Sequence, residues 1–301
     1  MLLKPKRRKM NITDFRTELT NYLLDNNDSI EIIDSDILKN NSVKLCGITI
    51  KREDKKVLPT IYLEEYFEQY KRGYSLDNIA IDILEFEEKN EFSHEFDEKF
   101  FNEFKKVKPF LFAKIINTNL NSELLKTIPN KPFLDLSIVV YCDVSDMCGM
   151  NASILVKNEH LCLWKIDKET VIEIALNNTK EKGFNTFSMK EIAEKYCDEN
   201  GRCDDVFHQN GVDMKIYTTN NKLFGAISML FLENEKDIDE DGVYIIPSSI
   251  HEVILLPKKM CESEEYINNV ISEVNNSSVE KQEVLSEHAY YYNKSDGYRI
   301  V

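Results

Sequence analysis

The sequence has little glycine and proline, and it lacks any long apolar run. Nine glycines and seven prolines among 301 residues are too few for a collagen-like or low-complexity architecture. The longest nearly uninterrupted apolar run, residues 226–232, is far shorter than the roughly 20 residues of a membrane-spanning helix. We therefore expect a folded protein with no membrane partner.

The cysteines lack the regular, paired spacing of a disulfide framework. There are seven of them, and an odd number at scattered positions is typical of reduced thiols in a cytoplasmic protein. The first nine residues carry five basic side chains, but no apolar segment follows to complete a secretory signal. These features predict a cytoplasmic protein whose residues 1–9 form a basic disordered tail. A role of that tail in localisation or phosphate binding stays open.

Basic residues are outnumbered by acidic ones, 38 to 53, so the net charge is −15. General nucleic-acid binding needs clustered lysine and arginine, and this balance argues against it. The glycine motifs of the common nucleotide-binding loops are also missing, so we expect no cofactor. An acidic surface is instead suited to another protein that carries a basic surface.

The sequence does contain apolar patterns typical of helices and apolar patterns typical of strands. The spacing of Phe15, Leu19 and Leu23 predicts a helix, and residues 134–141 predict a buried strand that pairs with residues 152–157. Hydrophobic residues make up 42% of the chain, which is enough for a core. We expect an α+β fold with mixed or antiparallel sheets and flanking helices. An N-terminal helix-strand-helix subdomain would span residues 10–92, and a C-terminal α+β subdomain would span residues 93–301.

Three segments of the second half carry more specific predictions. Residues 214–219 and 223–230 flank two asparagines and a lysine, a pattern typical of a β-hairpin. Residues 243–246 and 253–256 predict two short strands of one sheet. Apolar residues at positions 267, 270, 271 and 274 predict the last helix.

Short motifs occur in a fixed order along most of the chain. They include residues 59–64 (Pro-Thr-Ile-Tyr-Leu-Glu), 135–141 (Asp-Leu-Ser-Ile-Val-Val-Tyr), 152–155 (Ala-Ser-Ile-Leu), 219–220 (Thr-Asn), 225–226 (Gly-Ala) and 247–252 (Pro-Ser-Ser-Ile-His-Glu). In this order, the chain from about residue 10 to residue 295 resembles the uncharacterised bacterial family called domain of unknown function 5688. The resemblance implies one family-defining unit in an intracellular protein of low-GC anaerobic bacteria, carried on mobile elements. It implies no reaction and no catalytic residue.

Residues 247–252 hold the most suggestive group of polar side chains. Ser249, His251 and Glu252 supply a hydroxyl, an imidazole and a carboxylate, and Asp135 is a further candidate for a supporting carboxylate. These are the groups of a hydrolytic site, in which a base activates a nucleophile and a third group orients the base. The alternative is structural, because Ser-x-x-Glu is also the pattern of a helix-capping box or a turn.

A second group suggests a metal site only weakly. Cys197, Cys203 and His208 could ligate zinc, but structural zinc sites bring paired cysteines two to four residues apart. We therefore expect no bound metal. Two functions stay open: a non-catalytic binding or interaction protein, linked to mobile elements or host defence, and a hydrolase that uses residues 249–252. The first is favoured, because the chain is acidic and has no recognisable active-site motif.

Overall fold

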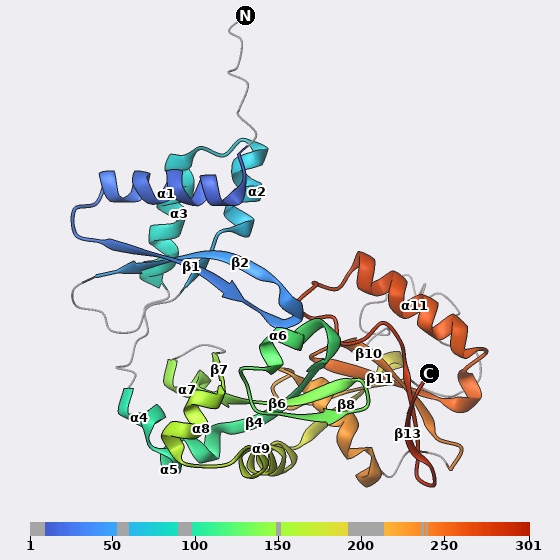
Figure 1. Ribbon diagram of the computed structural model, residues 1–301. Coiled ribbons are helices and arrows are strands. Elements are labelled where there is room, and N and C mark those ends of the chain that lie inside the picture. Colours follow the sequence, from blue (N-terminus) through green and yellow to red (C-terminus); the bar gives the residue numbers. More distant parts are fainter. Residues whose placement is uncertain are drawn as a thin grey trace, which may run out of the picture. The chain divides into compact units, whose positions relative to one another are not determined.

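The computed structural model describes residues 10–52, 60–89, 98–148, 152–191, 214–235, 238 and 240–301 (Figure 1). These residues divide into two units. The smaller consists of the described parts of Met1–Lys39, Val43–Glu98 and Ser145–Ala152, and the larger consists of those of Asn40–Ser42, Lys99–Val144 and Ser153–Val301. The fold class is α+β, as predicted, with three antiparallel sheets and flanking helices.

The smaller unit contains a three-stranded sheet in the order β1-β2-β3. Its core joins Phe15, Leu19 and Leu23 to Ile48 and Ile50 of the central strand, and all five side chains are buried. The helix predicted from the first three residues is therefore confirmed. The elements of the unit are α1 (Ile12–Asp25), β1 (Glu31–Leu38), β2 (Lys44–Lys51), β3 (Ile61–Tyr62), α2 (Glu64–Arg72), α3 (Leu76–Lys89) and α7 (Ser145–Cys148).

Local side-chain chemistry explains where these helices begin and end. Asn11 and Asp14 form a reciprocal capping box at the start of α1, in which the Asn11 side chain accepts the Asp14 N–H at 2.8 Å. The Ser75 hydroxyl accepts the Asn78 N–H at the start of α3. Gly73, with φ of 113°, ends α2 in the left-handed region that glycine adopts without strain.

The larger unit contains a four-stranded sheet built around β6 (Leu136–Asp143). This strand pairs with β4 (Leu111–Asn117), β5 (Asn130–Phe133) and β7 (Ser153–Leu155). Seven of its eight residues are buried, so the strand predicted at residues 134–141 and its predicted partner are both confirmed. Helix α9 (Lys168–Lys182) packs against β4, β5 and β6.

A six-stranded sheet completes the larger unit, in the order β13-β12-β10-β11-β9-β8. Helix α11 (Glu264–Ser277) packs on β10 and buries Ile267 and Ile271 there. The two strands predicted at residues 243–246 and 253–256 pair directly, as expected. The strands are β8 (Phe184–Ser188), β9 (Lys215–Thr219), β10 (Val243–Ser249), β11 (Glu252–Pro257), β12 (Tyr290–Asn293) and β13 (Gly297–Ile300).

The hairpin predicted from residues 214–230 is wrong in its second half. Residues Gly225–Asn234 form a 3₁₀-helix, η5, that packs on β9 instead of pairing with it. Both edges of β9 are already occupied, by β8 and by β11. The run 225–229 is buried throughout, and a short apolar run buried on all sides does not reveal its secondary structure by periodicity.

Short helical elements connect the strands and the longer helices of the described ranges. None of the helices in those ranges is both long enough and apolar enough to cross a membrane. The expected tail at residues 1–9 lies outside the described residues, as do residues 192–213. The connecting elements are η1 (Asn40–Ser42), α4 (Glu98–Asn102), α5 (Phe104–Val107), η2 (Lys108–Phe110), η3 (Asn119–Asn121), α6 (Ser122–Leu125), α8 (Asn158–Trp164) and η6 (Lys258–Met260).

Candidate functional site

The segment with Ser249, His251 and Glu252 is a tight β-turn and caps no helix. Ser249 pairs with Glu252 across the end of β10 and β11, which leaves Ile250 and His251 as the two turn residues. The capping-box form of the prediction is therefore wrong, because β11 continues where a helix would have to begin. The turn alternative holds: the Ser249 hydroxyl accepts the backbone N–H of His251 at 3.0 Å.

The His251 ring makes no hydrogen bond with the Ser249 hydroxyl, its expected nucleophile, among the described residues. Its Nδ1 accepts the backbone N–H of Phe224 at 3.1 Å, and its Nε2 lies 3.5 Å from a carboxylate oxygen of Glu283. The ring also stacks on Phe224, with 5.5 Å between the ring centroids. The Glu252 carboxylate accepts the Ser248 hydroxyl at 3.2 Å. Neither Ser249 nor Glu252 is thus placed to exchange a proton with the imidazole.

Asp135 contacts a different histidine from the one that the sequence suggested. It lies in the turn between β5 and β6, where Oδ2 is 2.9 Å from Nε2 of His288. Its other oxygen, Oδ1, accepts the Tyr290 hydroxyl at 2.9 Å. No hydrogen bond or ion pair joins Asp135 to His251 or Glu252 in the part of the chain that the structure describes.

The contacts of Asp135, His288 and Tyr290 indicate a structural role for this cluster. His288 Nδ1 lies 3.1 Å from the carbonyl oxygen of Ala289, so acceptors face both nitrogens of the ring. Burial, together with the nearby Asp135 carboxylate, raises the pKa of Tyr290 far above its ordinary value. The phenol therefore stays protonated and donates to Asp135. Sequence analysis missed this cluster, because the histidine follows the aspartate by 153 residues.

The thiols and acidic groups offer no metal site among the residues described. No group of three or more histidine, cysteine, aspartate and glutamate side chains there could hold an ion. Cys197, Cys203 and His208, the weak zinc candidates, lie outside the described residues. Burial raises the pKa of Cys142 to about 12, which makes that thiol a poor ligand and a poor nucleophile.

The outer face of α11 carries the most distinctive exposed surface. Tyr266, Val270 and Val274 follow one another at intervals of four residues, and their exposed fractions are 64%, 39% and 44%. Residues four apart in a helix lie on the same side, so these three form one apolar stripe, here called the α11 stripe. The sequence predicted the helix from its apolar residues, but only Ile267 and Ile271 of that set face the core.

Acidic residues accompany the α11 stripe. The helix contains three glutamates and no lysine or arginine. Glu264 is already engaged, because it accepts hydrogen bonds from Arg299 and from the Tyr244 hydroxyl, and these hold its pKa below the ordinary value. Glu265 and Glu273 are exposed and make no ion pair with any described residue. The stripe is thus an apolar surface beside free negative charge.

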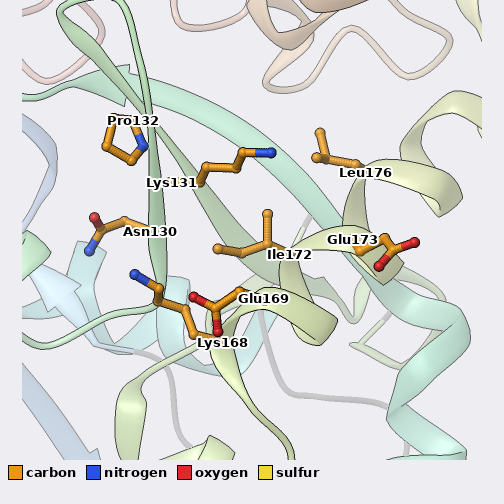
Figure 2. A pocket seen from close by; sticks show the side chains of 8 residues that line it. All are labelled: Asn130, Lys131, Pro132, Lys168, Glu169, Ile172, Glu173 and Leu176. Atoms are coloured by element: carbon orange, nitrogen blue, oxygen red, sulfur yellow. The ribbon is translucent and has the colours of Figure 1, made fainter.

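A pocket of about 440 Å³ lies between β5 and the first half of α9 (Figure 2). Lys131 reaches into it from the strand, and Lys168, Glu169 and Glu173 surround it from the helix. The buried side chain of Ile172 contributes to an apolar floor. A volume of this size is within the range of small-molecule sites.

Comparison with known proteins supplies a family but no activity. No curated protein and no solved structure matches the chain. The model of a family of unknown function, DUF5688, matches residues 12–294, which confirms the resemblance seen in the motifs. That match spans nearly the whole chain, and the protein belongs to the DUF5688 family.

Proposed function

We propose that this protein is a non-catalytic binding protein, and that the α11 stripe docks a partner protein. The partner surface would carry an apolar groove bordered by lysine or arginine. The observation that carries this proposal is the exposure of Tyr266, Val270 and Val274 along one side of a helix whose opposite side is buried.

The spacing of the three side chains suits a groove. Apolar anchors at intervals of one helical turn are the usual means by which a helix is recognised by an apolar groove. Tyrosine is also enriched among the residues that contribute most to binding, because its large ring buries area at little cost in conformational entropy. Tyr266 is the most exposed of the large hydrophobic residues described, and it is the anchor that we expect to matter most.

The acidic residues beside the α11 stripe indicate which charge the border of the partner's groove should carry. Glu265 and Glu273 have no ion-pair partner among the described residues, so a basic rim on the partner would supply one without breaking an existing contact. The net charge of −15 would steer a basic partner toward the protein over longer distances. Binding should therefore weaken as the salt concentration rises.

We do not propose the hydrolase that the sequence left open. The nitrogens of His251 face the Phe224 backbone and Glu283, and those of His288 face Ala289 and Asp135. No serine, threonine or cysteine side chain forms a hydrogen bond with either imidazole in the described part of the chain. Neither imidazole is therefore placed to activate a side-chain nucleophile, and Glu252, the carboxylate expected beside His251, accepts the Ser248 hydroxyl instead.

The cellular setting is part of the same proposal. We place the protein in the cytoplasm of a bacterium, because Cys46, Cys142, Cys162 and Cys261 are free thiols, as expected for a reducing compartment. A link to mobile elements or host defence rests on the family resemblance, and the identity of the partner would test it.

The test places a photo-crosslinking amino acid at Val270 of the full chain in cells of the native host. A control chain carries the same group at Ile81, an exposed residue of α3. We expect one protein to be crosslinked from position 270 and not from position 81. Its binding to the purified chain is then measured by calorimetry at low and high salt.

Variants decide whether the crosslinked protein recognises the stripe. Tyr266→Ala should raise its dissociation constant roughly 30-fold, the equivalent of about 2 kcal/mol for a central anchor. Tyr74→Ala, at an exposed tyrosine before α3, should leave the constant unchanged. Equal binding by the two variants, the absence of a specific crosslink, or a crosslink to a second copy of the chain would each overturn the proposal.

A further inference from the structure

The face of the six-stranded sheet on which α11 packs continues beyond that helix as an apolar row. Direct register pairs link one side chain from each of β10, β11, β9 and β8, and directly paired residues lie on the same face of a sheet. These four residues, here called the sheet platform, are Ile246, Ile254, Ile216 and Phe187. Ile246 packs against the core under α11, so the platform begins at the helix and runs to the edge strand β8.

The platform is less covered than the opposite face of the same strands. On the opposite face, Tyr217 and Val253 are buried, and Phe231 of η5 contacts Phe184, with 5.1 Å between the ring centroids. The four side chains of the platform, in contrast, are only half-buried. Apolar side chains gathered into one accessible patch are typical of a protein–protein contact.

The spacing of strands and helices indicates what fits on the platform. Helix α11 is centred on β10, because its core cluster contains Tyr244 from that strand and one residue from each neighbouring strand, Leu256 and Tyr291. Neighbouring strands are about 4.8 Å apart, and packed helices lie about 8–10 Å apart. A second helix beside α11 would therefore lie above β9, two strands away, with Ile216 beneath its axis.

The α11 stripe points toward the same half of the sheet. The Asn268 side chain accepts the Ala289 N–H and donates to the Val301 carbonyl, so it points toward β12 and β13. Successive residues of a helix are rotated by about 100°, which places Val270 about 200° from Asn268. The stripe is thus on the flank that faces β11 and β9. Stripe and platform adjoin as two apolar surfaces, one on the helix and one on the sheet.

Unpaired charges of opposite sign lie at the two outer borders of these surfaces. Glu273, three residues after Val270 on α11, is exposed. At the far end of the platform, Nζ of Lys222 lies 5.1 Å from the centre of the Phe187 ring. Neither charge makes an ion pair with any residue in the described ranges. A helix between them would be favoured by basic side chains on one border and acidic side chains on the other.

We infer that the partner that docks on the α11 stripe also places an amphipathic helix on the sheet platform, beside α11 and above β9. This inference rests on the function proposed above, and it defines one wall of the partner's groove. The partner helix turns its apolar side chains toward the platform and the stripe. It carries lysine or arginine toward Glu273 and aspartate or glutamate toward Lys222. Binding involves no covalent step.

The first experiment maps the partner residues that lie next to each surface. The photo-crosslinking amino acid is placed at Ile216 in one full chain and at Val270 in another, and the crosslinked peptides are identified by mass spectrometry. We expect both positions to capture the same protein, on one helix and within about two turns of each other. A control chain carries the group at Ile154, a half-buried isoleucine of β7 in the other sheet, and should capture nothing.

The outcomes separate this inference from the proposed function. Capture from position 270 without capture from position 216 would overturn the inference and leave the proposed function standing. The inference also fails if position 216 captures a strand or loop of the partner, a different protein, a second copy or another part of its own chain. Capture from neither position would overturn both.

Matched variants test the same contact by calorimetry with the captured protein. Ile216→Ala should raise its dissociation constant about tenfold, whereas Ile154→Ala should leave it unchanged. Lys222→Glu should raise it about fivefold. Lys180→Glu, at an exposed lysine of α9, changes the net charge equally and should have little effect. Circular dichroism would confirm the fold of each variant. Unchanged binding by Lys222→Glu and by a folded Ile216→Ala would overturn the inference, even where Tyr266→Ala weakens binding.

Discussion

The imidazole of His288 and the carboxylate of Asp135 lie 2.9 Å apart although the two residues are 153 positions apart in the chain. The contact joins the segment before β12, in the six-stranded sheet, to the turn between β5 and β6, in the four-stranded sheet. Asp135 also accepts the hydroxyl of Tyr290, which is fully buried. One carboxylate thus ties together two sheets that share no strand.

Removal of this carboxylate should destabilise the larger unit. Asp135→Ala leaves the buried Tyr290 hydroxyl without its acceptor, and such a loss costs about 1–3 kcal/mol. Asp135→Asn keeps an oxygen that can accept from Tyr290 and should cost less. Urea denaturation would measure both, with Asp28→Ala, at an exposed aspartate, as the control. If Asp135→Ala is as stable as that control, the contacts of Asp135 contribute nothing to the free energy of unfolding.

Ser249 provides a test of the turn between β10 and β11. Ser249→Ala removes the acceptor for the His251 N–H and should lower the free energy of unfolding by about 0.5–1.5 kcal/mol. Ser249→Asp keeps an acceptor of the right reach and should restore most of that loss. Ser263→Ala, which removes the N-cap of α11, gives a reference of about 1 kcal/mol. A fully stable Ser249→Ala variant would contradict the structural role.

Gly225 lies where even a methyl group does not fit. A Cβ at this position would overlap the Thr218 hydroxyl and the backbone carbonyl of His251. Both are fixed by their own hydrogen bond, in which the hydroxyl donates to that carbonyl at 2.7 Å. Gly225→Ala should therefore cost about 1–3 kcal/mol, measured by thermal unfolding. Gly297→Ala is a useful comparison, since it meets no neighbouring atom but has a positive φ, which isolates backbone strain from steric overlap.

His160 should make the stability depend on pH. Burial beside Phe101 and Trp164 lowers the pKa of His160 below 6.5, so the unfolded chain takes up its proton first as the pH falls. The free energy of unfolding is thus unaffected above about pH 6.5 and declines as the pH falls through the lowered pKa. His160→Asn keeps an acceptor for the Lys157 N–H, the bond that Nδ1 makes in the parent, and does not titrate. Denaturant midpoints between about pH 7.5 and pH 5 should fall less steeply for this variant, and parallel profiles would contradict the assignment.

The cysteines should differ sharply in reactivity. Cys162 is exposed, whereas Cys142 is buried and its pKa is raised to about 12. At about pH 8 only roughly one Cys142 thiol in ten thousand is ionised, and the thiolate is the reactive form. Iodoacetamide labelling followed by peptide mass spectrometry should modify Cys162 in the folded protein and Cys142 only after denaturation. Early labelling of Cys142 would show that the strand opens.

Much of the fold was predictable, because many helices and strands are determined by residues that are close together in the sequence. The helix with Phe15 and Leu19 and the last helix, with Ile267 and Ile271, each depend on residues within a few positions of each other. Strand β6 was predictable because a nearly continuous apolar run of that length suits a strand buried on both faces. These elements required no knowledge of the rest of the chain.

The candidate site required contacts between distant residues, and these were not predictable. Ser249 was expected to accept a backbone N–H, and it does, but a four-residue pattern does not distinguish a helix start from a hairpin turn. The partners of Asp135 come from the far end of the sequence. Val270 and Ile271 are adjacent and equally apolar, so only the packing of α11 decides which of them stays exposed.

The order of strands in the six-stranded sheet sets the order in which it can be completed during synthesis. Strand β9 leaves the ribosome before β11, and β10 leaves it before β12. Until β11 arrives, one edge of β9 has no partner, and open edges invite pairing with other chains. The 3₁₀-helix η5 is the next segment to emerge, and it packs on β9. An apolar segment that leaves the ribosome so early can cover the apolar face of β9 while the growing chain is still attached, and the edge waits for β11.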